Sequence, residues 1–195
     1  MKTQVQELVD ALPNLDSSDM LLVGIDGCGG AGKSTLAEEL ATRQENAQVV
    51  HIDDFYKPKD KRVEVTETTP VHINFEFERL KQQVLEPLEK GEPATYQTTG
   101  GEMKEVKPRG YIIVEGLGTL GTELRNHFGF KVWVDALEAV RRQRGVERDS
   151  EDWATIWDTE YLPQDARYVR EQAPQQVADI VINNDRTDRI KTSRF

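Results

Sequence analysis

The sequence predicts an α/β fold, in which residues 1–195 form a single domain with a mainly parallel central sheet between two layers of helices. Short apolar runs of the length of buried parallel strands alternate with stretches of helical spacing. Such alternation is typical of sheets whose two faces are both covered by helices. In addition, a glycine-rich segment joins the first clear strand to the first long helix, and neither a linker nor an internal repeat divides the chain.

The expected elements follow in chain order. Strands are expected at 20–26, 48–53, 111–115, 131–135 and 177–182. Helices are expected at 3–12, 33–43, 75–90 and 136–144. Pro87 should weaken the third helix near its end, because a proline inside a helix removes a hydrogen bond. Residues 57–69 are polar and aperiodic, which indicates an exposed loop, and 91–108 are expected to form a loop or a hairpin.

Composition narrows the range of partners and compartments. The chain has 35 acidic and 25 basic residues and a net charge of −10, so its surface repels nucleic acids and anionic membranes. No run approaches the roughly 20 apolar residues that cross a bilayer, and residues 1–15 lack the apolar core of a signal peptide. Cys28 is the single cysteine, so no internal disulfide forms. We therefore expect a cytoplasmic protein with a small-molecule ligand and no nucleic-acid or membrane partner.

The segment 27–34 (GCGGAGKS) matches G-x-x-x-x-G-K-[ST] between an expected strand and an expected helix. Glycines let the backbone wrap phosphate groups closely, and the helix that follows presents its positive end to the same anion. Lys33 supplies charge for the β- and γ-phosphates, and the Ser34 hydroxyl suits Mg²⁺. The pattern therefore predicts a P-loop, or Walker A, nucleotide site rather than a chance glycine turn. Its expected residues are Gly27, Cys28, Gly29, Gly30, Ala31, Gly32, Lys33, Ser34 and Thr35.

Two members of this segment have alternative interpretations. Thr35 either contacts the α-phosphate or, with its neighbour, caps the helix. Cys28 is expected to fill space, although a helix N-terminus lowers a thiol pKa and would favour a redox role.

Carboxylates stand at the ends of two expected strands. Asp53 belongs to 51–56 (HIDDFY), and Glu115 ends the run 111–115. The carboxyl ends of neighbouring parallel strands face one crevice, so both are expected near the γ-phosphate. There Asp53 can accept the proton of an attacking hydroxyl and help to organise Mg²⁺. Phe55 and Tyr56 offer aromatic surface to a flat or sugar-bearing substrate. The alternative is that the aspartates cap a loop and the rings pack in the core.

Four arginines lie close together in an otherwise acidic chain, at 141, 142, 144 and 148. A kinase needs positive charge that arrives over the transferring phosphoryl group. We assign this role to Arg144 and Arg148, because Gly145 between them permits a bend. Arg141 and Arg142 are expected to pair with acidic residues such as Glu138 on a solvated helix face. Beyond them, aromatic residues recur every four positions at 153, 157 and 161, a stripe typical of core packing.

Four segments together resemble the uridine kinase and phosphoribulokinase group of P-loop kinases. They are GIDGCGGAGKST, DDFY, VEG at 114–116 and RRQRGVERD at 141–149. The resemblance spans most of residues 20–183 and implies a P-loop NTPase fold of three layers, α/β/α. It also implies a small arginine-bearing lid at about 141–165.

Carried over to single positions, the resemblance implies that Asp53 is the base or the hydroxyl-orienting carboxylate. Tyr56 would belong to the substrate pocket, and Glu115 would stand beside the magnesium site with Ser34 and Asp53. The stretch 93–100 corresponds to the nucleoside motif of the family. Tyr96 stands for the tyrosine of that motif, whereas its acid, its second aromatic residue and a nearby histidine are absent.

The expected function is that of an ATP-binding, magnesium-dependent cytoplasmic kinase, a transferase that phosphorylates a hydroxyl group of a small molecule. Asp53 would position or deprotonate the hydroxyl, while Lys33, Arg144 and Arg148 neutralise developing charge. A nucleoside is the first-choice acceptor; a sugar, a sugar phosphate, pantothenate or nicotinamide riboside would fit the same chemistry. A nucleotide-binding regulatory P-loop protein is the alternative from another class, although 183–186 (NNDR) does not match the N-K-x-D of guanine-specific switches. Family analogy leaves assembly into a homo-oligomer open.

Overall fold

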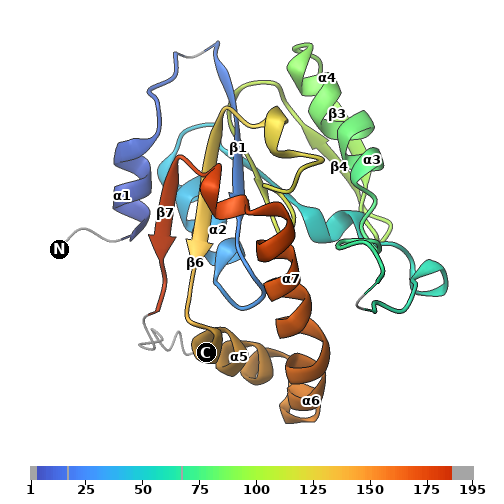
Figure 1. Cartoon of the computed structure of the whole chain (residues 1–195). Helices are drawn as coiled ribbons and strands as arrows, with labels where there is room; N and C mark the ends of the chain where they lie inside the picture. Colours follow the sequence, from blue (N-terminus) through green and yellow to red (C-terminus); the bar gives the residue numbers. More distant parts are fainter. Residues whose placement is uncertain (1–3, 17, 67, 186–195) are drawn as a thin grey trace, which may run out of the picture.

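A central parallel sheet organises the molecule (Figure 1). The computed structural model describes residues 4–16, 18–66 and 68–185. Within these ranges five strands form one sheet, in which every neighbouring pair is parallel. In spatial order the strands are β2 (Gln48–His51), β5 (Gly110–Glu115), β1 (Met20–Asp26), β6 (Phe130–Asp135) and β7 (Ile180–Asn183).

All five expected strands are present: β1 has the expected bounds, β5 and β6 each begin one residue earlier than expected, and β2 and β7 differ by more. β2 stops at His51 because the chain tightens into the 3₁₀ turn Ile52–Phe55. β7 begins only at Ile180, after the 3₁₀ turn Pro174–Gln176. An apolar run in the sequence can thus be longer than its strand, because a neighbouring turn buries some of the apolar residues.

Seven α-helices lie in the described ranges. They are α1 (Gln4–Ala11), α2 (Lys33–Arg43), α3 (Phe77–Leu80), α4 (Glu86–Glu89), α5 (Glu138–Asp149), α6 (Ala154–Ile156) and α7 (Leu162–Gln172). The π-helical turn Lys81–Leu85 joins α3 to α4, so the helix expected at 75–90 is one run with a widened middle. Pro87 has no N–H to donate within this run. A second π-helical turn, Trp157–Tyr161, joins α6 to α7.

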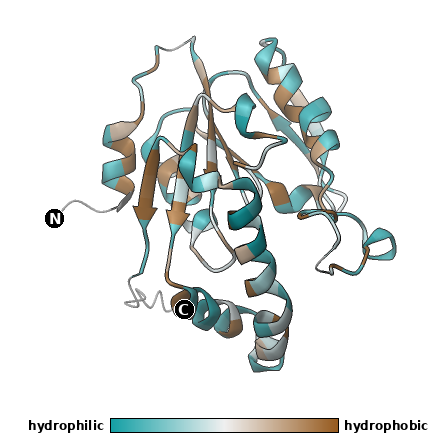
Figure 2. Ribbon diagram, in the orientation of Figure 1, coloured by the Kyte–Doolittle hydropathy of each residue, from teal (hydrophilic) through white to brown (hydrophobic). Residues whose placement is uncertain are grey.

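The two faces of the sheet bury different sets of side chains, because successive side chains of a strand point to opposite faces. Ile112 and Val114 of β5 pack with the α3–α4 run on one face. Ile113 packs with α1 and α2 on the other. Figure 2 shows the apolar residues gathered along the strands, while hydrophilic residues cover the outer sides of the helices. The three-layer α/β/α architecture of a P-loop NTPase is therefore confirmed.

A β-hairpin stands apart from the main sheet. β3 (Ala94–Gln97) and β4 (Met103–Val106) pair antiparallel as a separate two-stranded sheet. Ala94, Tyr96 and Val106 join the core on the α3–α4 side. The hairpin alternative for 91–108 is thus confirmed. The expected loop at 57–69 contains the 3₁₀ turn Lys59–Lys61 and otherwise no helix or strand in its described part.

The carboxyl ends of β1, β5 and β2 lie side by side at one edge of the sheet. The glycine-rich segment follows β1, Glu115 ends β5, and Asp53 follows β2. The expected carboxylates and phosphate loop are therefore brought to one edge. Across the described residues, no helix combines the length and the apolar character needed to span a bilayer.

Candidate active site

The phosphate loop runs from the end of β1 to the start of α2 at Lys33. Gly30 and Gly32 have φ angles of 75° and 99°, in the left-handed region where glycine alone is relaxed. A side chain on Gly30 would also collide with the backbone of Arg141. The Lys33 ammonium group folds back and donates to the Cys28 carbonyl at 3.2 Å. The glycines of the motif are thus required by the backbone path.

The outer side of the loop is held by neighbouring segments. Asn184 Nδ2 donates to the Ala31 carbonyl at 2.7 Å, and Arg144 Nη2 donates to the Asn184 carbonyl at 2.8 Å. Arg144 Nη1 also lies 3.4 Å from the Gly30 carbonyl. Arg144, expected above the phosphoryl group, therefore supports the backbone of the loop as well as lining the site.

The structure decides between the alternative interpretations of Cys28 and of Thr35. Burial raises the pKa of the Cys28 thiol to about 12. A redox role would need a lowered thiol pKa, so that interpretation is wrong. The residue packs with Trp133 and Tyr168 as a space filler. Gly32 is the N-cap of α2, and no side-chain hydrogen bond caps the helix. The capping interpretation of Thr35 is therefore wrong, and Thr35 instead lines a cavity.

Two cavities meet at the phosphate loop and share Gly30, Lys33, Ser34 and Arg148. The donor-side cavity has a volume of about 400 Å³, and Gly32, Thr35, Arg144 and Asn184 complete its lining. The acceptor-side cavity has a volume of about 250 Å³, and Asp53, Glu115 and four aromatic residues contribute to it. These four are Tyr56, Phe75, Trp157 and Tyr161. Tertiary structure thus brings Lys33, Ser34, Asp53, Tyr56, Glu115 and Arg148 around one space.

Glu115 makes one strong contact and leaves one oxygen without a partner. His51 Nδ1 lies 2.6 Å from Glu115 Oε1, and this bond raises the pKa of His51. Glu115 Oε2 is buried and has no hydrogen-bond partner among the described residues. A buried carboxylate oxygen normally finds a donor or a cation. This oxygen and the nearby Ser34 hydroxyl fit a hard cation such as Mg²⁺.

In the described ranges no group of three or more His, Cys, Asp or Glu side chains is arranged to hold a metal ion by itself. Mg²⁺ commonly uses one or two protein ligands and takes the rest from phosphates and water. The donor set here is of that kind.

Asp53 stands in the 3₁₀ turn after β2 and reaches solvent in the acceptor-side cavity. Partial desolvation and the Glu115 carboxylate raise its pKa, while Lys33 opposes the shift. A carboxylate with a raised pKa binds a proton more tightly, which makes it a better proton acceptor. The position and the environment of Asp53 therefore both suit a general base.

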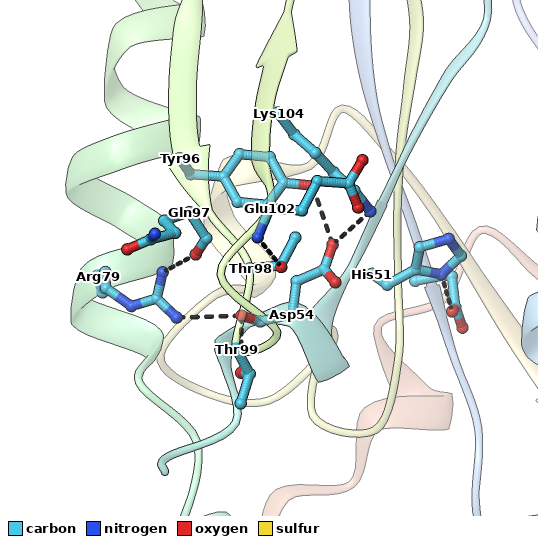
Figure 3. Close-up of polar contacts among 10 residues, drawn as sticks. His51, Asp54, Arg79, Tyr96, Gln97, Thr98, Thr99, Glu102 and Lys104 are labelled. Atoms are coloured by element: carbon cyan, nitrogen blue, oxygen red, sulfur yellow. Dashed lines mark hydrogen bonds and ion pairs between the residues drawn. The ribbon is translucent and has the colours of Figure 1, made fainter.

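The neighbouring Asp54 connects this turn to the hairpin (Figure 3). Tyr96 Oη and Lys104 Nζ donate to Asp54 Oδ2 at 3.1 and 3.0 Å. The Asp54 carbonyl accepts from Arg79 Nη2 at 3.1 Å and from the Thr99 amide at 2.9 Å. Asp54 thus fixes the turn that carries Asp53 and does not line the acceptor-side cavity itself.

Phe55 and Tyr96 are not placed in the acceptor-side cavity. Phe55 is fully buried and Tyr96 is 1% exposed. Their rings stack with centroids 4.9 Å apart, and the Arg79 guanidinium lies over Phe55. The expectation that these two rings contact substrate is corrected, because the α3–α4 run and the hairpin enclose them in the core. Tyr56 does line the cavity and packs edge-on against Phe75.

The arginine segment forms α5, a continuous helix. Gly145 produces no bend, because its bare Cα instead lets Trp157 pack against the helix. Arg148 is paired with Asp149 and lines both cavities. Arg142 pairs with Asp158 on the surface, as expected of a solvated arginine, although Glu138 is not its partner. The expectation of a solvated face is wrong for Arg141, which is buried and pairs with Asp165.

The aromatic stripe after α5 is only partly core. Trp157 is buried with Val146 and Leu162, yet it also lines the acceptor-side cavity together with Tyr161. Trp153 is 41% exposed. The helical spacing correctly indicated packing for one member and missed the contribution of two members to the cavity.

Sequence reasoning missed a buried acid beside the loop. Asp26 is fully buried at the end of β1, and it accepts bonds from Gly27 N, Leu120 N and Tyr168 Oη at 2.6, 2.7 and 2.6 Å. The sequence did contain a signal for Asp26, because a charged residue at the end of an apolar strand requires partners. Those partners come from positions distant in the sequence, and only the fold could identify them.

The fold and the phosphate loop define a P-loop NTPase. Comparisons with known proteins then identify the family. A uridine kinase of Clostridium botulinum (strain Kyoto / Type A2) is 30% identical over 184 residues, which cover 83% of this chain and 87% of that protein. A uridine kinase of Clostridium novyi (strain NT) is 29% identical over 181 residues, covering 83% and 86%. The chain belongs to the uridine kinase family.

Solved structures agree on the fold. A structure described as a possible uridine kinase from Bacillus stearothermophilus superposes with a TM-score of 0.67 at 21% identity, over 92% of this chain and 97% of that one. A D-glycerate 3-kinase from Cryptococcus neoformans superposes with a TM-score of 0.51 at 13% identity, over 89% and 84%. A scan against protein-family models found no match.

Proposed function

We propose that the protein transfers the γ-phosphoryl group of ATP to a hydroxyl group of a nucleoside, with Mg²⁺ as the metal. The observation that carries the proposal is the acceptor-side cavity, where Lys33, Asp53 and Glu115 surround one space next to the phosphate loop. The likeness to uridine kinases supports the same chemistry.

The lining of this cavity favours an acceptor with a flat ring. Tyr56, Phe75, Trp157 and Tyr161 contribute aromatic surface, and a base stacks well on such rings. Gln164, beside them in the cavity, offers both a hydrogen-bond donor and an acceptor. A nucleoside has the ring for the aromatic residues and the hydroxyl for Asp53. An acceptor without a flat ring would leave this surface unused.

In the proposed reaction Asp53 accepts the proton of the attacking hydroxyl, whose oxygen bonds to the γ-phosphorus while ADP leaves. Lys33 and Arg148 stabilise the negative charge on the transferring group. Ser34 and Glu115 would hold Mg²⁺, which supplies neutralising charge on the phosphates when bound. The aromatic residues orient the acceptor and exclude water from the reacting oxygen.

The test is ATP consumption with a panel of acceptors, namely uridine, cytidine, other nucleosides, nicotinamide riboside, pantothenate and simple sugars. We expect turnover with a nucleoside, and little turnover with sugars and pantothenate. Asp53→Asn should lower this turnover by roughly 10²- to 10⁴-fold and keep ATP binding, whereas Asp60→Asn, in the exposed loop, should change neither. Turnover with pantothenate or a sugar alone would replace the nucleoside with that acceptor. ATP binding with no acceptor-dependent turnover would favour the regulatory alternative.

A further inference from the structure

A buried ion pair lies against the phosphate loop. Arg141 of α5 and Asp165 of α7 have side chains that are 9% and 4% exposed, and Arg141 Nη1 lies 2.6 Å from Asp165 Oδ2. Removing two charges from water is unfavourable unless both make well-directed bonds. Val146, Trp157 and Leu162 form an apolar contact nearby. The packing of α5 on α7 can therefore be apolar and does not require a charged pair at this point.

The remaining bonds of this pair go to one residue of the loop. The Gly29 amide donates to Asp165 Oδ2 at 2.9 Å. Arg141 Nη1 is 3.4 Å from the Gly29 carbonyl. Both backbone polar groups of Gly29 are therefore bound by the ion pair. Trp157 also closes over this residue, since a Cβ on Gly29 would lie 3.2 Å from its ring.

The charges of the pair offset each other beside the phosphate site. Asp165 lines the acceptor-side cavity with Lys33 and Ser34. A lone carboxylate there would repel a phosphate, whereas the Arg141 guanidinium bonded to it offsets the negative charge. The pair therefore adds little net field to the cavity, and its effect on the loop is geometric.

We propose that the Arg141–Asp165 pair is a positioning device for the nucleotide site, which clamps the Gly29 peptide between α5 and α7. Because α5 also carries Arg144 and Arg148, the pair fixes the distance between these arginines and the loop. Arg141 and Asp165 are positioning residues in this scheme and do not touch the reacting atoms. The proposal rests on the proposed function only for the identity of the nucleotide.

The test separates geometry from stability with a double variant. Arg141→Met/Asp165→Leu replaces the ion pair with apolar side chains, an exchange that is often neutral or stabilising in buried sites. It removes the partners of Gly29 and leaves the catalytic groups in place. Asp165→Asn, which has nearly the same shape, is a second variant. Arg142→Met/Asp158→Leu is the matched control, because this pair joins α5 to the same helical segment at the surface.

Hydrogen exchange of residues 27–34 reports on the clamp without any nucleotide. We expect exchange in this segment to be about tenfold faster or more in the double variant, because local opening becomes easier. In the control variant, residues 27–34 should exchange at the wild-type rate. Thermal unfolding shows whether each variant is folded. A folded double variant with wild-type exchange would overturn the proposal.

Binding of ATP with Mg²⁺, followed by calorimetry, is the second readout. We expect affinity in both test variants to fall roughly ten- to a hundredfold, since the bonds that hold Gly29 involve charged groups, and bonds of this kind have effects of about that size. The KM for the acceptor should change less than the affinity for ATP, because the substitutions alter only Asp165 in the lining of the acceptor-side cavity and keep Asp53 and Tyr56. Tighter ATP binding would overturn the proposal and identify Asp165 as a competitor of phosphate. Absence of acceptor turnover in the wild type would instead contradict the proposed function and leave the exchange result standing.

Discussion

The imidazole of His51 is bonded to the carboxylate of Glu115 at 2.6 Å, across a register pair of the parallel strands β2 and β5. The bond uses one oxygen of Glu115, and the other oxygen is buried without a partner among the described residues. The arrangement fixes the carboxylate at the edge of the sheet, where Glu115 contributes to the lining of the acceptor-side cavity. His51 had no recognisable motif, and only the register of the two strands assigns it this role.

Glu115→Gln should weaken the dependence on Mg²⁺. The amide keeps the shape but loses the charge that suits a hard cation. We expect the Mg²⁺ concentration for half-maximal activity to rise roughly ten- to a hundredfold, a range seen when groups around metals are changed. The measurement is a Mg²⁺ titration of ATP consumption. Glu105→Gln, on the exposed side of β4, is the control and should leave the titration unchanged. An unaltered curve in Glu115→Gln would remove this residue from the metal site.

Asp53→Asn should lower kcat and spare nucleotide binding. The amide cannot accept the hydroxyl proton, and general base catalysis contributes roughly 10²- to 10⁴-fold. Asp53 lies in the 3₁₀ turn held by Asp54, so the turn should persist in the variant. Steady-state kinetics with ATP and the acceptor, together with calorimetry of ATP binding, provide the measurement. A variant that keeps more than about a tenth of the wild-type kcat would show that Asp53 is not the base.

Arg144 and Arg148 should affect different steps. Arg144 bonds the loop through Asn184 and the Gly30 carbonyl, so Arg144→Met should mainly weaken ATP binding. Arg148 has a more exposed side chain, paired with Asp149, and lines both cavities. Arg148→Met should therefore mainly lower kcat, because a charge near the transferring group acts in the transition state. Equal effects of both variants on KM and kcat would contradict this division.

Asp26 should make stability depend on pH. Burial raises its pKa to about 6, against about 3.9 in the unfolded chain. The folded state then binds this proton more tightly, so the stabilisation is complete below about pH 4 and is lost as the pH rises through about 6. The shift corresponds to roughly 3 kcal/mol.

Asp26→Asn removes this titration, and its amide N–H groups would face the donors Gly27 N, Leu120 N and Tyr168 Oη. We expect the variant to be less stable than wild type, with a gap that narrows as the pH rises from about 4 to about 7. Urea unfolding across this range measures the gap. A gap that widens with pH would mean that the pKa is lowered in the fold.

Gly145→Ala should destabilise the packing of α5 against Trp157. The added methyl group would collide with the Trp157 ring, and overpacking of this kind typically costs about 1–3 kcal/mol. Because Trp157 also lines the acceptor-side cavity, the KM of the acceptor should rise as well. Gly100→Ala is the control, since its nearest neighbour would lie 3.6 Å away. Thermal unfolding and acceptor kinetics test both. A Gly145→Ala variant as stable as wild type would show that α5 and Trp157 move apart freely.

The sequence by itself determined the class of fold and the nucleotide site. Short continuous runs of apolar residues predict the strands, because a buried parallel strand must be apolar on both faces. The segment 27–34 could be predicted to bind phosphate because it matches G-x-x-x-x-G-K-[ST] between a strand and a helix, and the positive φ angles of Gly30 and Gly32 agree with glycine at these positions. Both features are local, so a short window of sequence contains the information.

Tertiary structure alone decided which side chains line the acceptor-side cavity. Phe55 and Tyr56 are adjacent in sequence, yet Phe55 points into the core and Tyr56 lines the cavity. Asp165 reaches Gly29 across 136 positions of the chain. These relationships depend on how α7 and the hairpin pack against the sheet edge, and no local propensity encodes that packing. The reason is physical: burial and ion pairing are set by contacts between distant segments, whereas backbone conformation is set largely by neighbours in the sequence.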